Sequence, residues 1–158
     1  MRIDKSFSTD AGNVALGIIK SGKIKKQESF YLLPDRKELA VRNVHLNDKD
    51  VDEAGKGDRF GISYKGEVIQ NRSLLVPLRN NFEVATSVNG RFIKSPFFKD
   101  DLEHKIHAYH NYQFVEAMVS SSELRLDKPL AYKKGDRILV VDSSNQKIRI
   151  AGVFTSAW

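Results

Sequence analysis

The stretch Leu39-Ala40-Val41-Arg42-Asn43-Val44-His45-Leu46 alternates apolar and polar residues. Successive side chains of a β-strand point to opposite faces, so this period of two predicts a strand with one buried side and one solvent-facing side. Similar apolar runs occur at 14–19, 29–33 and 59–64. Turns rich in Gly, Asn, Asp or Lys-Gly separate such runs about every 8 to 12 residues, a spacing typical of an all-β protein.

The second half of the chain repeats this pattern. The dipeptide Asn89-Gly90 predicts a hairpin turn, because both residue types tolerate positive φ. The only helix candidates are 48–54 and 99–103, and both are too short to be stable on their own. Further strands are expected at 82–88, at 104–119 with one break at Asn111, at 137–142 and at 147–154.

A change of domain is expected near Pro77, where the polar stretch Arg79-Asn80-Asn81 could join two units. A chain of 158 residues can form one medium domain or two small ones. We place the boundary between residues 78 and 79. The predicted domains are therefore 1–78 and 79–158.

The composition is that of a folded protein, with 41% hydrophobic and 29% charged residues. No apolar run approaches the roughly 18 residues that span a bilayer, and the start, Met1 to Lys5, lacks the apolar centre of a signal peptide. The absence of cysteine excludes disulfide scaffolds and thiolate chemistry. We therefore expect a cytoplasmic protein with no membrane partner. The net charge of +6, shared equally between the two halves, favours polyanionic partners such as RNA.

Residues Gly17 to Ile24 nearly match a phosphate-binding P-loop, G-x-x-x-x-G-K-[ST]. Ile24, however, stands where a hydroxyl would reach Mg²⁺, and a strand rather than a helix is expected to follow. A β-hairpin with a glycine at its turn is the favoured interpretation.

Three histidines, His104, His107 and His110, are spaced by three, which raises the possibility of a metal site. On a strand, His104 and His110 would share one face and His107 would take the other, so the three would not converge. We expect surface histidines and no metal. No nucleophile-elbow motif is present, and carboxylate pairs such as Asp100-Asp101 lie in polar loops, so we predict no catalytic residues.

Several runs resemble the second and third domains of translational GTPases of the elongation factor Tu and SelB type. The first half carries Gly17-Ile18-Ile19-Lys20-Ser21-Gly22-Lys23-Ile24-Lys25, Val41-Arg42-Asn43-Val44-His45 and Lys56-Gly57-Asp58-Arg59-Phe60-Gly61, in the family's order and spacing. The second half carries Gly135-Asp136-Arg137-Ile138-Leu139 and Arg149-Ile150-Ala151-Gly152. The opening, Met1 to Ser8, resembles the SelB branch. Asp10 to Val14 and Arg72-Ser73 depart from the family's glycine-rich motifs, which suggests a divergent paralogue.

The resemblance implies two consecutive small antiparallel β-barrels of Greek-key type, without the GTPase domain that precedes them in the family. In these factors domain II holds the aminoacylated 3′ end of tRNA and domain III contacts the acceptor and T arms. By this resemblance, the nucleic-acid-binding residues expected here are Arg42, His45, Lys49, Arg59 and Lys65.

Two functions remain open at this point. The first is a tRNA-binding or ribosome-associated pair of barrels, either the C-terminal portion of a longer elongation factor or a stand-alone paralogue. The alternative is a protein-interaction module that docks a GTPase domain or another protein without binding RNA. In neither case is the chain an enzyme by itself. No cofactor is expected, and GTP and Mg²⁺ would belong only to a GTPase domain of a longer parent protein.

Overall fold

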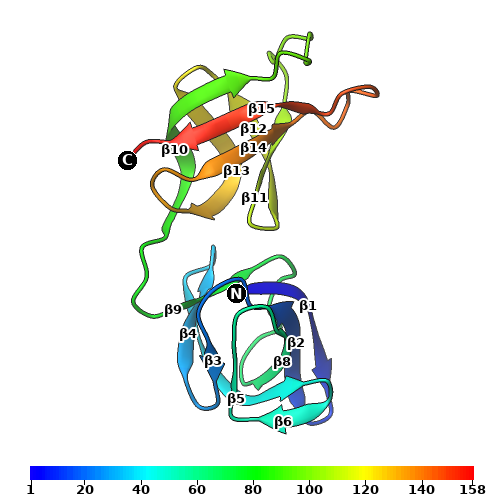
Figure 1. The fold of residues 1–158 in the computed structure, drawn as a ribbon, viewed down its shortest axis with the longest axis vertical. Coiled ribbons are helices and arrows are strands. Elements are labelled where there is room, and N and C mark those ends of the chain that lie inside the picture. The colour runs from blue at the N-terminus through cyan, green and yellow to red at the C-terminus, as the bar shows by residue number, and fades with distance from the viewer. The chain divides into compact units, whose positions relative to one another are not determined.

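The computed structural model describes all 158 residues, which form two compact units of β-strands, Met1–Asn80 and Asn81–Trp158 (Figure 1). We call these units barrel 1 and barrel 2. No helix in the structure has the length and apolar character needed to cross a membrane. The strands are β1 (Arg2–Thr9), β2 (Gly12–Ile18), β3 (Ile24–Lys25), β4 (Ser29–Leu33), β5 (Lys37–Leu46), β6 (Lys49–Val51), β7 (Glu53–Ala54), β8 (Arg59–Tyr64), β9 (Leu74–Pro77), β10 (Glu83–Lys94), β11 (Ile106–His110), β12 (Gln113–Val119), β13 (Glu123–Tyr132), β14 (Arg137–Val141) and β15 (Ile150–Ser156).

Barrel 1 is a ring of six antiparallel strands in the order β4-β9-β1-β2-β8-β5, closed by pairing of β4 with β5. Strand β6 extends the sheet beyond β5, and β3 pairs with β7 in a separate two-stranded sheet. Barrel 2 is a closed ring in the order β10-β13-β12-β11-β14-β15. The predicted fold class, all-β with two consecutive antiparallel barrels, is confirmed.

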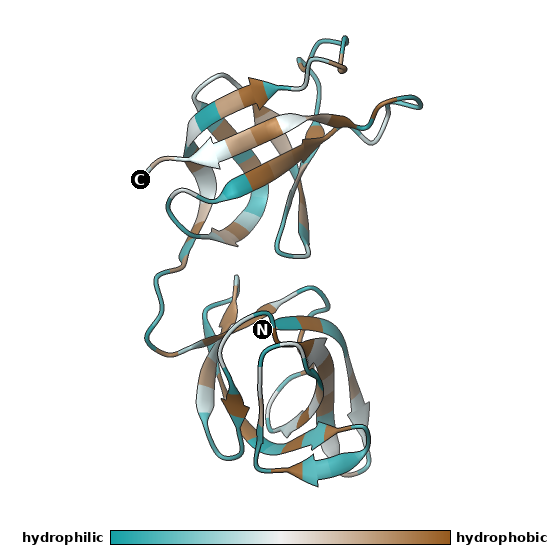
Figure 2. Ribbon diagram, viewed as in Figure 1, coloured by the Kyte–Doolittle hydropathy of each residue, from teal (hydrophilic) through white to brown (hydrophobic).

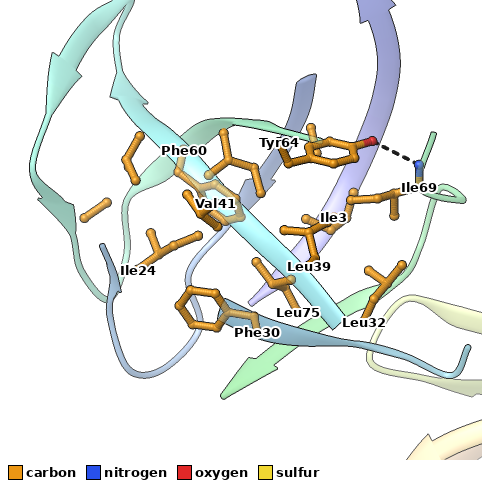
Figure 3. Packing of buried hydrophobic residues seen from close by; sticks show 14 of the residues in the cluster. Ile3, Ile24, Phe30, Leu32, Leu39, Val41, Phe60, Tyr64, Ile69 and Leu75 are labelled. Carbon is orange, nitrogen blue, oxygen red and sulfur yellow. Dashed lines mark hydrogen bonds between the residues drawn. The ribbon is translucent and has the colours of Figure 1, made fainter. Parts of the chain in front are cut away.

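The interior of barrel 1 is filled by the inward-facing residues of its strands (Figure 3). Ile3, Val41 and Leu75 come from three different strands and are almost fully buried. Tyr64 is also buried, and its hydroxyl group accepts a hydrogen bond from the Ile69 amide at 3.0 Å. The polar end of this large side chain is thereby satisfied, as burial of a hydroxyl requires.

Two β-bulges shape the outer wall of barrel 1. The register between β1 and β2 shifts between Ile3 and Lys5, which leaves Asp4 as the extra residue. The register between β5 and β8 shifts between Val41 and Asn43, which leaves Arg42 as the extra residue. A bulge interrupts the alternation of faces, so consecutive residues can point outward. Asp4 and Lys5 are both exposed, and so are Arg42 and Asn43.

Barrel 2 is closed by β10, which runs without interruption through Asn89-Gly90. The predicted hairpin turn at this dipeptide is therefore wrong. A Cβ atom on Gly90 would lie 2.0 Å from the carbonyl oxygen of Thr155, so glycine is required here by the close approach of β15. Strand β10 changes its pairing partner between Asn89 and Gly90. Residues 83–89 pair with β13, and residues 90–94 pair with β15.

Three other local predictions differ from the structure. The helix candidate at 48–54 contains the short strands β6 and β7, and the candidate at 99–103 forms neither helix nor strand. The stretch after Gly17 is not a hairpin, because β2 pairs with β1 and β8 while β3 pairs with β7. In each case non-local strand pairing overrides the local pattern. The expected break at Asn111 is confirmed, since Asn111 and Tyr112 both have positive φ in the turn between β11 and β12.

Candidate nucleic-acid interface

A hollow of about 680 Å³ lies on barrel 1 where β1, β2, β8 and β5 run side by side. Its floor includes the apolar side chains of Phe7 and Leu16, which are 38% and 41% exposed. Large apolar side chains that remain this exposed on adjacent strands form a surface on which a flat apolar group can pack. The residues that line the hollow are Asp4, Lys5, Phe7, Val14, Leu16, Gly17, His45, Asn47, Asp48, Arg59, Phe60 and Gly61.

Two glycines shape the wall at the hollow, one on its inner face and one on its outer face. A Cβ atom on Gly17 would lie 2.1 Å from the Arg2 carbonyl oxygen, so glycine allows β2 to approach β1. A Cβ atom on Gly61 would lie 3.3 Å from a methyl group of Leu16 and 3.8 Å from the Cβ of His45. Any side chain at position 61 would therefore project between these two lining residues. Gly61 thus keeps this part of the hollow open, and the hollow as a whole is about the size of a small-ligand site.

The rim of the hollow carries charges of both signs. The guanidinium group of Arg59 lies 3.6 Å from the carboxylate of Asp4, and both side chains are accessible to solvent. Lys5 adds a second cation beside this pair. Across the hollow, Asp48 stands in the two-residue turn between β5 and β6, where Asn47 and Asp48 both adopt positive φ. Asn and Asp tolerate this conformation better than other non-glycine residues, so the turn presents a carboxylate at the rim.

The hollow brings together two of the five predicted site residues, His45 and Arg59. Arg42 lies outside the hollow at the bulge of β5 and is exposed. Lys49 pairs in register with Leu46, and paired residues of an antiparallel ladder project to the same side. Because Leu46 packs against the core, Lys49 projects away from the side on which His45 lines the hollow.

Lys65 lies at a different place. It lines a second hollow of about 400 Å³ that is formed mainly by residues 35–39 and 64–70. Arg59 and Lys65 are six residues apart along an extended segment, which corresponds to about 20 Å. At this second hollow, Lys37 donates a hydrogen bond to Glu67 at 2.8 Å, and this contact lowers the pKa of the Glu67 carboxyl group. The five predicted residues therefore do not form one cluster.

Sequence reasoning missed most of the lining residues, among them Asp4, Lys5, Phe7, Leu16 and Asp48. Phe7 faces outward on β1, and it lines the hollow because β1 pairs with β2. This pairing is not visible in the sequence around Phe7. Asp4 and Lys5 face outward together because of a bulge, which has no clear sequence signal. Asp48 could have been found, because Asn-Asp between two apolar runs is a signal for a tight turn.

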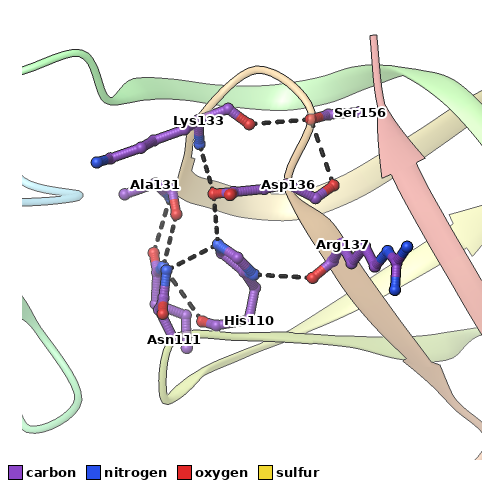
Figure 4. Close-up of polar contacts among 8 residues, drawn as sticks. His110, Asn111, Ala131, Lys133, Asp136, Arg137 and Ser156 are labelled. Carbon is purple, nitrogen blue, oxygen red and sulfur yellow. Dashed lines mark hydrogen bonds and ion pairs between the residues drawn. The ribbon is translucent and has the colours of Figure 1, made fainter. Parts of the chain in front are cut away.

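The three histidines of barrel 2 contact three different groups. His104 Nε2 lies 3.0 Å from the Asp142 carboxylate. The ring of His107 stacks on Phe114 with ring centroids 4.3 Å apart. His110 Nδ1 donates to the Arg137 carbonyl oxygen at 3.1 Å, and its Nε2 lies 3.0 Å from Asp136 (Figure 4). No group of three or more His, Asp or Glu side chains is arranged to hold a metal ion.

The fold defines the structural class of the chain: two consecutive antiparallel β-barrels, a fold that is also found in solved structures of translational GTPases. The chain matches only part of each of these factors, and the likeness is one of fold.

The SelB translation elongation factor of Methanococcus maripaludis has this fold. Its apo form and its complex with the GTP analogue GppNHp match the whole chain with TM-scores of 0.83 and 0.85, at 20% identity. A bacterial selenocysteine-specific elongation factor matches 98% of the chain with a TM-score of 0.80 at 16% identity. The chain covers 43% and 42% of the two SelB structures and 27% of the bacterial factor.

Among curated sequences, an uncharacterized protein of Methanocaldococcus jannaschii is 29% identical over 164 residues. The alignment includes 96% of this chain and 52% of that protein, so the chain spans about half the length of this relative. No family model matches the sequence.

Proposed function

We propose that the chain is the barrel portion, or a stand-alone paralogue, of a SelB-like or Tu-like elongation factor, and that barrel 1 binds the aminoacylated 3′ end of tRNA in the hollow between β1, β2, β8 and β5. The hollow itself carries the proposal, because it combines an exposed apolar floor with a rim of both charges. It also contains His45 and Arg59, which the resemblance to domain II associates with the 3′-end pocket. Such a protein acts in the cytoplasm and requires no cofactor of its own.

The chemistry of the rim suits a group that carries both charges. An aminoacylated 3′ end has phosphates, a terminal base and a protonated α-amino group. Arg59 and Lys5 can contact phosphate oxygens, while Asp4 and Asp48 can accept hydrogen bonds from the amino group. The exposed ring of Phe7 and the Leu16 side chain offer the base an apolar surface.

The cations outside the hollow have a different role in this proposal. Arg42 is exposed and has no ion-pair partner, and the same holds for Lys49 and Lys65. Phosphate contacts of this kind position a nucleic acid without reading its sequence. They also make affinity depend on salt, because each neutralised phosphate releases counterions. We therefore assign Arg42, Lys49 and Lys65 to the flanking phosphates and His45 and Arg59 to the 3′ end.

The test compares the binding of aminoacyl-tRNA with that of the same tRNA after deacylation. We expect Arg59→Ala and Lys5→Ala to weaken binding of the aminoacylated form at least tenfold and to reduce the preference for it. Arg42→Ala should weaken both forms equally and reduce the slope of log K against log salt by about 1. Lys20→Ala, which removes an exposed lysine of barrel 1 outside the hollow, is the matched control. Absence of any tRNA binding at about 50 mM salt would refute the proposal.

A further inference from the structure

Two loops at one end of barrel 2 are joined to each other. Residues 95–105 connect β10 to β11, and residues 142–149 connect β14 to β15. Figure 1 shows both loops extending beyond the strands. The side-chain amide of Asn145 in the second loop donates a hydrogen bond to the Asp100 carboxylate in the first. We call the two loops together the tip of barrel 2.

Local contacts hold both loops in shape. In the first loop, Phe98 is 2% exposed and belongs to the core of barrel 2. In the second, the side-chain oxygen of Asn145 accepts hydrogen bonds from the amides of Lys147 and Ile148 at 3.0 and 2.9 Å. An Asn side chain that binds nearby amides in this way stabilises a turn. The tip is therefore ordered before a partner arrives, so docking costs little conformational entropy.

Large apolar side chains are exposed on both loops. Phe97 is 73% exposed and Ile148 is 39% exposed, and both line a hollow of about 560 Å³ that residues of the two loops form. Ile150, which begins β15 directly after the second loop, is 50% exposed. In Figure 2 both loops carry hydrophobic as well as hydrophilic segments. Single exposed apolar side chains are common, but several on two adjoining loops indicate an interaction site.

Cations alternate with these apolar residues. Lys99 and Lys147 line the same hollow. Residues 147–150 read Lys-Ile-Arg-Ile, so that a cation precedes each isoleucine. Lys147 and Arg149 are exposed, and neither forms an ion pair.

The carboxylates near the tip do not cancel these cations. Asp100 is the one carboxylate that lines the hollow, and it already accepts the hydrogen bond from the second loop. Asp142 is 2% exposed and accepts a hydrogen bond from the Ser144 amide at 2.9 Å. Asp101 and Glu103 lie outside the hollow. The hollow therefore has an excess of positive charge, which suits an anionic group.

We propose that the tip of barrel 2 binds the surface of an anionic lipid bilayer. Phe97 and Ile148 enter the boundary between the headgroups and the acyl chains, where peripheral proteins bury apolar side chains. Lys99 and Lys147 extend along this apolar surface to the lipid phosphates, and Arg149 adds a third cation. Such an anchor lies on the bilayer and needs neither a spanning segment nor a signal peptide, the two features on which the expectation of no membrane partner rested.

The side chains of the tip favour lipid over RNA and over a protein. Nucleic-acid bases stack on aromatic rings, and Phe97 is the one exposed ring of the tip, beside two exposed isoleucines. A stable protein interface takes about 20–30 residues from each partner, with complementary shapes. A fluid bilayer needs no complementary shape, and it offers an apolar interior directly beneath a layer of phosphates.

Sedimentation with lipid vesicles measures the binding. The full chain is mixed with vesicles of phosphatidylcholine alone, or of equal parts of phosphatidylcholine and phosphatidylglycerol. We expect at least tenfold more chain on the anionic vesicles at about 0.1 M salt, and loss of most of this binding at about 1 M salt, where the Debye length is about 3 Å. Phe97→Ser and Lys147→Glu should each weaken binding at least fivefold. Met118→Ser and Lys128→Glu, at exposed positions of β12 and β13 outside the tip, are the matched controls.

A single introduced cysteine locates the contact, because the chain has no cysteine of its own. A polarity-sensitive dye on Phe97→Cys should emit at shorter wavelength when anionic vesicles are added, since the dye enters an apolar environment. The same dye on Met118→Cys should not change. Most of the Phe97 side chain lies in water, so its replacement leaves the core of barrel 2 intact.

Three results would overturn the proposal. The first is equal recovery of the chain with neutral and anionic vesicles, including recovery with neither. The second is a change in dye emission at position 118 as large as that at position 97. The third is the same change at position 97 when single-stranded RNA or excess unlabelled chain replaces the vesicles. None of these results depends on tRNA binding by barrel 1, which Phe97→Ser should leave unchanged.

Discussion

The side-chain amide of Gln113 pairs with the backbone of Ala131 in the way that one strand pairs with another. Its Nε2 donates to the Ala131 carbonyl oxygen at 2.8 Å, and its Oε1 accepts from the Ala131 amide at 2.8 Å. The backbones of β12 and β13 pair only at Ala117, Met118 and Val119. The backbone N–H and C=O groups of Ala131 lie outside this pairing and form their hydrogen bonds with the Gln113 side chain instead. Gln113 and Ala131 are both buried, and water cannot replace these hydrogen bonds.

Replacement of Gln113 by leucine should therefore destabilise barrel 2. The change leaves a buried N–H and a buried C=O without partners, each of which costs about 1–3 kcal/mol. We expect the free energy of unfolding to fall by about 3 kcal/mol, measured by urea denaturation followed by circular dichroism. Gln146→Leu, at an exposed position of the same barrel, should change it by less than about 0.5 kcal/mol.

Asp142 should make barrel 2 less stable in acid. Burial opposes ionisation of this carboxyl group, but hydrogen bonds from the Ser144 hydroxyl and amide and from His104 outweigh burial and lower its pKa. A carboxyl group with a lowered folded pKa adds stability above its unfolded pKa of about 3.9, and this stability is lost as the pH falls through the folded value. We expect unfolding free energies measured from pH 7 down to pH about 2 to decline below about pH 4. Asp142→Asn should lower stability at pH 7 and flatten the decline; an unchanged slope would contradict this account.

Tyr132 should ionise at unusually high pH. Burial, followed by its hydrogen bond to Glu83 at 2.9 Å and the charge of that carboxylate, raises the pKa of the phenol to about 12. The neutral phenol therefore adds stability that is complete below the ordinary pKa of about 10 and is lost as the pH rises through about 12. Titration of phenolate absorbance should show a component near pH 12 that Tyr132→Phe removes and Glu83→Gln shifts downward. A component that survives in Tyr132→Phe would show that another tyrosine is responsible.

Substitution of Gly17 by alanine should disturb the hollow of barrel 1. The added methyl group would lie 2.1 Å from the Arg2 carbonyl oxygen, so β1 and β2 must move apart. Such overpacking costs about 1–3 kcal/mol. Amide hydrogen exchange should accelerate in β1 and β2 while barrel 2 is unaffected. Gly55→Ala is the control, because the nearest atom to its added Cβ would be an Asp58 carboxylate oxygen at 4.0 Å. Its amide hydrogen exchange rates should equal those of the unsubstituted chain.

Many of the strands could be predicted because they depend on local alternation. The alternation in β5, from Leu39 to Leu46, is visible in one stretch of sequence, and so is the break at Asn111. The hairpin turn predicted at Asn89-Gly90 was wrong because Gly90 is required for the close approach of β15, more than sixty residues away. The dipeptide alone does not distinguish such a glycine from one in a turn.

The site was predicted less completely than the fold, because a hollow on a barrel wall is made by strands that meet through non-local pairing. His45 and Arg59 reach the hollow from β5 and β8, which are neighbours in the sheet. Lys65 directly follows β8, the strand that begins at Arg59, and lines the second hollow instead. Asp4 and Lys5 enter through a bulge whose position depends on the register with β2.

The division of β10 between two partners determines when barrel 2 can form during synthesis of the polypeptide. Residues 90–94 pair with residues 152–156, which belong to β15, the last strand of barrel 2 to be synthesised. A nascent chain that has not yet exposed this last strand therefore keeps an open edge on β10 and another on β14. Open edges of this kind recruit strands from other molecules. Early termination between residues 142 and 150 should thus yield an aggregation-prone product, whereas barrel 1 is already complete once β9 has emerged.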